Sequence, residues 1–489
     1  MLWMLIFVPL AAAVASFLIR SDALRRMLLI AAALCHTAAA AACWVYPTGP
    51  ILGGWFDIDP IAQYFLTLTS VLFLAGAFYA VGYLKAEQTG RKKDFMEDAF
   101  FINAPQAVFI GCLLLFLTTM TMVLASQHFG LLWVAMEATT LVSAPLIYFH
   151  RHHRSLEATW KYLLICSVGI ALALLGNFFL AIAASGTQTE SISLLRNALI
   201  ANGSKLSTPW IQAAFIFFLV GYGTKMGLAP LHTWLPDAHS EAPSVVSSLL
   251  SGALLNCAFV GILRAFEVAC AAGQTAFAQD LLVLFGLVSI AFAAVFIIGQ
   301  ADYKRLLAYS SVEHMGILAL GTGLGQAAVS GAMLHAVNHS LTKAVLFMTA
   351  GNILAVYKTK TASRVRGLFS VMPVSGLLWV AGLLAITGFP PFGTFLSEFT
   401  ILQSAVEQGY YGTAAAFLIL LGFIFIGFSA IALRMTQGQK PESVQPACER
   451  PPAVVPPLVL ITAVLLLGVY VPEPVNDMLH RAAVLLGGR

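Results

Sequence analysis

Apolar runs of about 20 residues recur along the whole length of this 489-residue chain. An α-helix rises about 1.5 Å per residue, so each run matches the hydrocarbon core of a bilayer, which is roughly 30 Å thick. Only 10% of the residues are charged, whereas soluble domains carry about 25%. Backbone groups without hydrogen bonds are costly in lipid, and helices satisfy these groups internally. The chain is therefore predicted to be an all-α polytopic membrane protein.

Fourteen apolar segments are predicted to span the bilayer. They are residues 2–19, 27–46, 62–83, 105–125, 128–149, 157–183, 209–228, 243–265, 281–300, 305–325, 327–356, 371–402, 410–433 and 453–472.

The Lys and Arg residues indicate how these segments cross the membrane. The loops that follow odd-numbered segments hold 18 of the 26 basic residues. The other loops hold Arg196, Lys205 and Arg264, and the C-terminal tail holds Arg481 and Arg489. The positive-inside rule then places the odd loops in the cytoplasm and both termini outside, in a prokaryotic cytoplasmic (inner) membrane. The outer loop GWFDIDP, residues 54–60, is predicted to be a structural turn or a short hairpin.

Several classes of protein are disfavoured by what the sequence contains. The seven cysteines form no CxxC pair and lie mostly in apolar runs, so they are expected to be small buried side chains rather than ligands of a cluster. No Walker loop and no GxGxxG motif ahead of a helix is found. The basic residues form no stripe with aromatic residues, so no nucleic-acid partner is expected. We expect no cofactor or metal, with energy supplied by an ion gradient or by a partner.

Two segments carry prolines where a membrane helix should continue. GLAPLHTWLPD (227–237) and GFPPFGTFLSE (388–398) align without gaps at four identical positions and end in an acid, Asp237 or Glu398. Proline removes an N–H donor and frees a carbonyl group, so each segment predicts a broken helix. Matched breaks in two halves of a transporter indicate its ion path.

The breaks fall in the seventh and twelfth predicted helices, and an odd offset of five reverses the direction of crossing. The chain is therefore predicted to contain two inverted five-helix repeats, residues 99–268 and 269–434. Residues 1–98 would form three preceding helices, and residues 435–489 a last helix with a short tail. Glu137 also loosely matches Glu313, and Lys161 loosely matches Lys343.

The stretch HAVNHSLTK places His335, His339 and Lys343 at i, i+4 and i+8, on one face of a helix. Charged groups at this depth are expensive and usually functional. The predicted proton-translocating residues are Glu137, Lys225, His335, His339, Lys343 and Glu398. No arginine occurs at these depths, and arginine is the basic residue that cannot release its proton. This choice favours proton transfer over static charge pairing.

A mechanism follows from burial and charge. Burial favours the neutral amine of Lys225, whereas a nearby carboxylate such as Glu137 favours the ammonium. Lys225 would therefore keep its proton when Glu137 is close and release it when Glu137 is pulled away. His339 and His335 would accept it, and Lys343 and Glu398 would complete the path.

Each residue also has a simpler interpretation. Glu137 and Lys225 can form a static buried pair, and the two histidines can be structural or can bind haem or a metal ion. Lys161 can simply extend to the membrane surface, and HRHHR (150–154) is expected to be a cytoplasmic anchor. The remaining polar residues are candidates for a half-channel, although those in LHTWLPDAHSE can equally form a helix-capping turn. These candidates are Lys161, His232, Asp237, His239, Glu241, Asn256, Glu313 and His314.

With these residues in view, the sequence resembles the proton-conducting antiporter-like membrane subunits of respiratory complex I, Mrp-type antiporters and membrane-bound nickel–iron hydrogenases. The stretches that carry the resemblance are LLWVAMEATTL, GTKMGLAPLHTWLPDAHSEAPS, DYKRLLAYSSVEHMG, HAVNHSLTK and GFPPFGTFLSEF. The hydrogenase-4 component F branch is the most similar, on the stretches EATTLVSAPLIYFHR, SLEATWKYLL and SSVEHMG. The resemblance implies fourteen helices, inverted repeats and proton translocation, and it assigns ion-path roles to the six residues above.

Two departures from the family pattern matter. Complex I members usually carry a lysine in the eighth helix, where this chain has Asn256, so proton storage at mid-path would fall to water or to His339. The largest members end in a long lateral helix, whereas this chain ends 17 residues after the last predicted span. We therefore expect it to pack against sister subunits.

The expected function is that of a proton-translocating subunit of a group 4 membrane-bound nickel–iron hydrogenase, similar to formate hydrogenlyase. The expected partners are other membrane subunits, peripheral redox subunits of hydrogenase type and the lipid bilayer. Alternatives are a subunit of an Mrp-type cation/proton antiporter, a complex I membrane subunit, and a membrane scaffold or haem-binding subunit.

Overall fold

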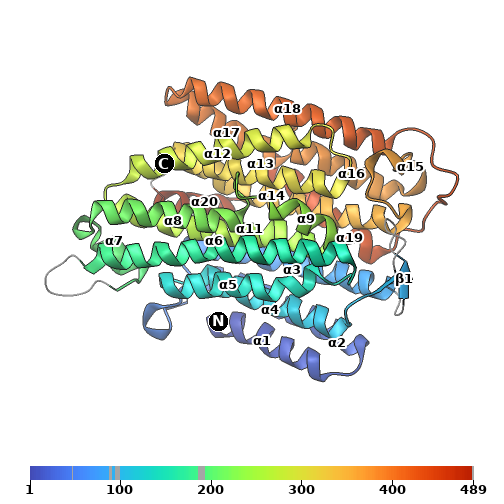
Figure 1. Cartoon of the computed structure of the whole chain (residues 1–489), viewed down its shortest axis with the longest axis horizontal. Helices are drawn as coiled ribbons and strands as arrows, with labels where there is room; N and C mark the ends of the chain where they lie inside the picture. Colours follow the sequence, from blue (N-terminus) through green and yellow to red (C-terminus); the bar gives the residue numbers. More distant parts are fainter. Residues whose placement is uncertain (47, 88–90, 94–99, 186–192, 487–489) are drawn as a thin grey trace.

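The computed structural model describes residues 1–46, 48–87, 91–93, 100–185 and 193–486, and its long helices run roughly parallel to one another (Figure 1). The predicted boundary between residues 98 and 99 and the basic residue Arg489 lie outside the described residues. The fold is mostly helical, and the helices stack from α1 at one edge of the bundle to α18 at the other (Figure 1).

The elements follow one another along the chain with short connections. They are α1 (Leu2–Leu18), α2 (Asp22–Val45), η1 (Leu52–Gly54), α3 (Pro60–Ala86), β1 (Arg91–Lys93), β2 (Phe100–Ile102), α4 (Gln106–Ala125), α5 (Phe129–Ile147), α6 (His153–Ser185), α7 (Arg196–Ala201), η2 (Gly203–Lys205), α8 (Thr208–Met226), α9 (Trp234–Glu241), α10 (Ser244–Leu249), η3 (Leu250–Leu254), α11 (Leu255–Ala271), α12 (Thr275–Ile297), α13 (Tyr303–Leu324), α14 (Ala327–Tyr357), η4 (Ala362–Arg364), α15 (Leu368–Val371), α16 (Pro373–Ile386), α17 (Gly393–Glu407), α18 (Tyr411–Thr436), α19 (Pro451–Val469) and α20 (Glu473–Leu485).

The predicted membrane segments coincide with helices of this bundle. In the part of the chain that is described, 10 helical segments are long and apolar enough to cross a membrane, and α1 and α16 are shorter apolar helices. Segment 209–228 corresponds to α8, with α9 beyond the break, and segment 371–402 corresponds to α16 and α17. The all-α membrane class is confirmed, while the total of fourteen spans stays a prediction.

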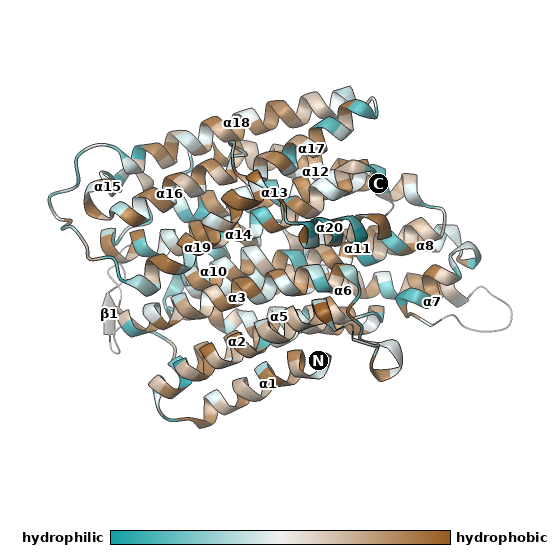
Figure 2. Ribbon diagram, turned by 180° about the vertical axis from the view of Figure 1, so that it is seen from behind, coloured by the Kyte–Doolittle hydropathy of each residue, from teal (hydrophilic) through white to brown (hydrophobic). Residues whose placement is uncertain are grey.

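Several elements were not expected from the sequence. They include the hairpin of β1 and β2, the short helix α7, and α20 in the C-terminal tail. The helix α20 is visibly more hydrophilic than its neighbours (Figure 2) and packs on α3 and α14 through Met478, Leu479, Ala482 and Ala483. A short amphipathic helix lacks the long apolar run by which the other helices were found, so hydropathy alone did not reveal it.

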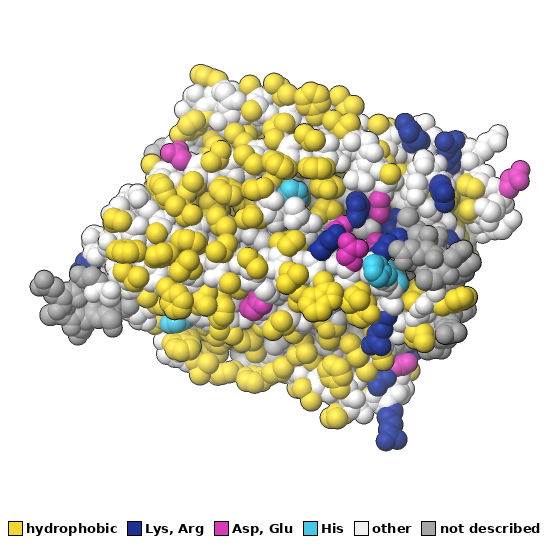
Figure 3. Space-filling model, viewed as in Figure 1, with side chains coloured by type: hydrophobic (Ala, Val, Ile, Leu, Met, Phe, Trp, Pro, Cys, Tyr) yellow, Lys and Arg dark blue, Asp and Glu magenta, His cyan; other side chains and the backbone are white. Residues whose placement is uncertain are grey.

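The surface and the centre of the bundle differ in a way that fits a bilayer. Apolar side chains cover most of the visible lateral face, and the visible Lys and Arg side chains gather mainly toward one end (Figure 3). The span Ser244–Ala271, made of α10, η3 and α11, is buried throughout its most apolar window. Its middle turn η3 is π-helical, a local irregularity often found at functional sites.

A buried cluster of charges lies near the end of the bundle where α7 is found. Asp59 of the predicted outer turn caps α3 by accepting from the Ala62 N–H at 2.9 Å. Its carboxylate also pairs with the guanidinium groups of Arg264 and Arg196, and Arg196 pairs with Glu267 at 2.8 Å. Burial raises the pKa of Asp59, but the two guanidinium charges and their hydrogen bonds outweigh it and hold the pKa below its usual value. The turn predicted for GWFDIDP is present, with an isolated bridge between Ile51 and Phe56.

Candidate functional site

The two proline-containing breaks have the same backbone design. The first residue of each break, Gly227 or Gly388, has a positive φ, +87° and +64° respectively, a conformation that favours glycine. The next N–H reaches back five residues in both cases, from Leu228 to Gly223 O at 2.8 Å and from Phe389 to Leu384 O at 3.0 Å. Each break also contains one cis X-Pro peptide, at Ala229–Pro230 and at Pro390–Pro391.

Side chains from beyond each break satisfy a carbonyl that the broken helix frees. The Trp234 indole N–H donates to Thr224 O at 2.8 Å, and the Thr394 hydroxyl donates to Ala385 O. These two carbonyls lie three residues before Gly227 and Gly388, so they occupy matched positions. The sequence match between the breaks therefore extends to how their backbone groups are satisfied, as membrane burial requires.

Lys225, on the last turn of α8 before the first break, is fully buried without a carboxylate in contact. Its Nζ donates to Thr140 Oγ1 at 2.8 Å and to the Tyr162 hydroxyl at 2.7 Å. The Tyr162 hydroxyl lies 2.6 Å from Ser143 Oγ. Neutral hydroxyl groups from α5 and α6 thus hold this amine.

Glu137 lies on α5, one turn before Thr140, and is only partly buried. Its Oε1 accepts from Ser167 Oγ of α6 at 2.8 Å, while its Oε2 has no hydrogen-bond partner. No ion pair joins it to Lys225. The alternative of a static buried pair is therefore not what the structure contains, although both side chains line the same α5–α6 region.

Lys343, on α14, is another fully buried amine. Its Nζ donates to Leu307 O at 2.6 Å and to the Ser310 hydroxyl, both on α13. Glu313 follows one turn later on α13 and is also buried. The loose sequence match of Lys343 with Lys161 does not extend to their surroundings, because the Lys161 side chain is 45% exposed.

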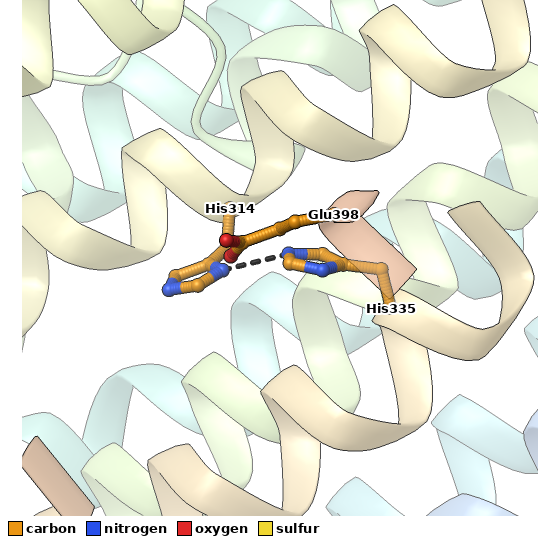
Figure 4. Close-up of side chains that lie close together, drawn as sticks. All are labelled: His314, His335 and Glu398. Carbon is orange, nitrogen blue, oxygen red and sulfur yellow. Dashed lines mark hydrogen bonds between the residues drawn. The ribbon is translucent and has the colours of Figure 1, made fainter. Parts of the chain in front are cut away.

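Three imidazoles meet between α13 and α14. His314 Nδ1 lies 2.7 Å from His335 Nε2 (Figure 4), and His335 Nδ1 lies 2.9 Å from Ser397 Oγ. The ring of His339 lies 4.9 Å from that of His314, measured between centroids, and neither of its nitrogens has a partner. All three rings are fully buried.

Glu398, at the end of the second break, points its carboxylate at this group of imidazoles (Figure 4). One ligand atom from each of His314, His335 and Glu398 lies within 4.8 Å of the other two. Glu398 is 8% exposed, and its Oε1 has no hydrogen-bond partner. The structure thus brings together His314, His335 and Glu398, although the first and last of these are 84 positions apart in the sequence.

Two further candidate residues, Asn256 and His239, contact α14 from neighbouring helices. Asn256, just after the π-helical turn, donates to Ser340 Oγ at 2.7 Å, next to His339 in sequence. His239 of α9 is fully buried, has no hydrogen-bond partner on either nitrogen, and stacks on Phe347 with centroids 5.0 Å apart. Ser340 and Phe347 both belong to α14, so Asn256 and His239 contact that helix from α11 and α9.

Three of the remaining half-channel candidates, Lys161, Asp237 and Glu241, form ion pairs. Lys161 pairs with Glu157 at 2.7 Å and with Asp237 at 2.9 Å, and Arg305 of α13 also binds Asp237. Basic and acidic side chains lie close together toward one end of the visible face (Figure 3). Asp237 therefore ties α9 to both predicted halves of the chain.

Glu241 and His232 differ from Asp237 in their contacts. Glu241 pairs with Lys360 at 2.9 Å and lies 3.7 Å from His152 Nε2. His232 is surrounded by the rings of Phe292, Phe296 and Tyr309. Neither α9 nor α10 has a side-chain cap, so the capping alternative for this stretch is wrong.

Sequence reasoning missed the hydroxyl groups that position the charged residues. These are Thr140, Ser143, Tyr162, Ser167, Ser310, Ser340 and Ser397. Several lie next to a predicted residue or one turn away, but serine and threonine are common in membrane helices, so only their contacts identify them. The buried pairing of Arg264 was also missed, because the residue was assigned to a loop.

Comparison with known proteins identifies the family. The family model described as "NADH:quinone oxidoreductase/Mrp antiporter, TM" matches residues 126–425, a range that contains both breaks and the buried residues above. The chain belongs to this family. It is an antiporter-like membrane subunit of the type found in complex I, Mrp and hydrogenase-4 systems.

Individual relatives agree with the family assignment. The hydrogenase-4 component F homolog of Methylacidiphilum infernorum is 36% identical over 437 residues, which cover 89% of each chain. A chain of the membrane-bound sulfane sulfur reductase, an archaeal respiratory membrane complex, has the same fold with a TM-score of 0.87 and 23% identity, over 100% of this chain and 98% of that one. A chain of the Mrp complex from Dietzia sp. DQ12-45-1b gives a TM-score of 0.86 at 18% identity, over 99% and 97%.

Proposed function

We propose that this chain translocates protons as a membrane subunit of a group 4 membrane-bound nickel–iron hydrogenase, similar to formate hydrogenlyase. Electron transfer in peripheral redox subunits would drive the movement of protons through the buried residues. The observation that carries this proposal is the row of titratable side chains between the two breaks, held by hydroxyl groups or lacking partners rather than locked in ion pairs.

The route begins at the first break. With Glu137 bound to Ser167 and not to Lys225, burial favours release of the Lys225 proton. The hydroxyl groups of Tyr162 and Thr140 are the first atoms that Nζ contacts. Movement of Glu137 toward Lys225 would favour the ammonium and reload it.

The route continues through the imidazoles. His339 lies beside His314, which hydrogen-bonds His335, and Glu398 lies against both of these rings. Neutral imidazoles accept and donate a proton through different nitrogens. Water in the helix breaks would bridge the remaining gaps, with Asn256 and His239 lining the path in place of the lysine usual in complex I members.

We also propose the arrangement in the membrane. The odd loops would face the cytoplasm and both termini the outer side, with residues 99–268 and 269–434 as inverted repeats. The matched glycines, N–H bonds and satisfied carbonyls of the two breaks support a repeat. The hydrogenase host is favoured by the 36% identity with the hydrogenase-4 component F homolog.

A subunit of an Mrp-type cation/proton antiporter is the second candidate, since the family model covers both kinds of protein. Sodium transport calls for fixed carboxylates along the path. Among the described residues, the group of His314, His335 and Glu398 contains two imidazoles and a single carboxylate, which favours protons. Neighbouring genes for hydrogenase large and small subunits would favour the first candidate, and a cluster of small antiporter subunits would favour the second.

The decisive experiment replaces a residue at each end of the row. Lys225→Ala and His339→Ala are expected to abolish proton uptake by the reconstituted complex while leaving assembly intact. Lys205→Ala is the matched control, because it removes an exposed lysine that bonds to Asn202 outside the proposed route. Normal proton uptake in both of the first two variants would refute the proposed route.

A further inference from the structure

The group formed by His314, His335 and Glu398 has the composition of a transition-metal site. Two imidazole nitrogens and one carboxylate oxygen are a common ligand set of Zn²⁺, which needs one further ligand such as water. The three ligand atoms already lie within 4.8 Å of one another, on α13, α14 and α17. Among the described residues, no other three His, Cys, Asp or Glu side chains bring their ligand atoms this close together.

The hydrogen bonds around His335 leave its Nε2 atom, which faces His314, without a proton of its own. Ser397 Oγ lies 2.8 Å from Thr394 O, which can only accept, and 2.9 Å from His335 Nδ1. When the single hydroxyl proton is donated to Thr394 O, Ser397 Oγ accepts from the Nδ1–H of His335. The Nε2 of His335 therefore carries a lone pair that points at His314. An outer hydrogen bond of this kind fixes the tautomer and orientation of metal-binding histidines.

A proton occupies the place where a metal ion would bind. The lone pair of His335 Nε2 accepts from the Nδ1–H of His314 at 2.7 Å. Two nitrogen ligands of tetrahedral Zn²⁺ lie about 3.3 Å apart, so the rings need to separate by about half an ångström. The proton of His314 can move to its Nε2, which has no partner.

Glu398 supplies an independent indication of a ligand. A buried carboxylate oxygen without a hydrogen-bond partner is costly, and Oε1 of Glu398 is such an atom. A cation bound between the carboxylate and the imidazoles would satisfy it. The carboxylate lies directly against Gly388.

We propose that His314, His335 and Glu398 bind a divalent transition-metal ion of the zinc type, and that the bound ion stops proton transfer at the second break. The inhibitory consequence rests on the proposed function, because the ion displaces the proton shared by the two imidazoles. The binding itself does not depend on proton transport.

Metal analysis of the purified membrane complex tests the site. The complex is incubated with ZnCl₂, passed through a desalting column with a weak chelator, and analysed by mass spectrometry for zinc per complex. Wild type is expected to retain one zinc ion more than Glu398→Gln and than His335→Asn. Subtracting the zinc content of the variants from that of wild type corrects for zinc that is bound elsewhere in the complex.

Two control variants remove the same residue types from other buried positions. His36→Gln removes a buried histidine that is bonded to Ser70 and Thr121, and Glu137→Gln removes the acid of α5. Both are expected to retain as much zinc as wild type. Equal zinc contents in wild type, Glu398→Gln and His335→Asn would overturn the proposal, provided that gel filtration shows each variant to be assembled.

The hydrogen bond between His335 Nδ1 and Ser397 Oγ provides a second test of the site. Ser397→Ala keeps all three ligands but frees the orientation of His335, so zinc affinity is expected to fall about tenfold. Unchanged affinity would overturn the proposed donor set. If zinc binds as described but wild-type proton uptake is insensitive to it, the metal site stands and the proton route through His335 is wrong.

Discussion

Two sets of buried charged residues lie in this bundle, and they are built in opposite ways. At one end, Asp59, Arg196, Arg264 and Glu267 pair directly with one another. Between the two breaks, the buried amines and imidazoles contact hydroxyl groups, a carbonyl or each other, and Glu398 has an oxygen without a partner. Arginine occurs in the first set and is replaced by lysine and histidine in the second.

This difference separates a structural role from a transport role. Guanidinium groups keep their proton, so a cluster with two arginines can hold the turn around Asp59, α7 and α11 together without changing charge. Lysine and histidine can lose a proton when they are buried, and hydroxyl partners stabilise both forms of an amine. The two sets can therefore be told apart by what happens when one acid is removed from each.

The largest effect is expected for Asp59→Asn. The change leaves Arg264 and Arg196 with Glu267 as their remaining acid, and breaking a buried pair in this way costs about 3–5 kcal/mol. The measurement is the thermal unfolding of the purified membrane protein. Asp57→Asn is the matched control, because the Asp57 carboxylate accepts from the adjacent Ile58 N–H and forms no ion pair. Equal stability of the two variants would contradict a structural role for the cluster.

The unfolding stability of wild type and that of Asp59→Asn should depend differently on pH. The pKa of Asp59 lies below its usual value in the folded chain, so the unfolded chain binds the proton more readily. The stabilisation is fully present above the ordinary pKa of aspartate, about 4, and is lost as the pH falls through the lower folded pKa. Wild type should therefore lose stability with acid more steeply than Asp59→Asn does.

This cluster also marks a limit of sequence analysis. Asp59 lies in a loop that was correctly predicted to turn, but its partner Arg264 is 205 positions away in the chain, and nothing local to Arg264 indicates that it is buried. The breaks behave differently, since glycine and proline determine their geometry locally and both were recognised. The sequence therefore predicts the local backbone geometry of the breaks, but it does not predict charge pairing between residues that are far apart in the chain.

Glu398→Gln is expected to behave in the opposite way to Asp59→Asn. The amide removes a buried carboxylate oxygen that lacks a partner, so unfolding stability should be kept or raised. Proton uptake should fall roughly tenfold or more, because a positioned acid–base group is lost. The two measurements together, thermal unfolding and proton uptake by the reconstituted complex, distinguish a transport residue from a structural one.

The control for this change is Asp280→Asn, which removes an exposed acid from α12. It should leave both stability and proton uptake close to wild type. A loss of stability in Glu398→Gln as large as that in Asp59→Asn would mean that both acids serve the same structural purpose, and the contrast between the two sets would fail.

The candidate residues were predicted more completely than their surroundings. Spacing placed His335, His339 and Lys343 on one helix face, and all three are fully buried there. That His314 and Glu398 complete a group with His335 depends on how α13, α14 and α17 pack, which no periodicity encodes. The same reason explains why Glu137 and Lys225 were predicted as a pair but contact different hydroxyl groups.

The smallest effect is expected for Tyr162→Phe, which removes one of the two hydroxyl groups that hold Lys225 and keeps the ring against Trp234. A buried ammonium that loses a hydrogen bond costs about 1–3 kcal/mol. Lys225 can avoid most of this cost by losing its proton, an option that Arg264 lacks. The deficit in unfolding stability should therefore be larger at about pH 6 than at the ordinary lysine pKa of about 10.4, where loss of the proton costs least. A deficit that is the same at both values would mean that Lys225 stays charged throughout, and the row between the breaks would then be as static as the cluster around Asp59.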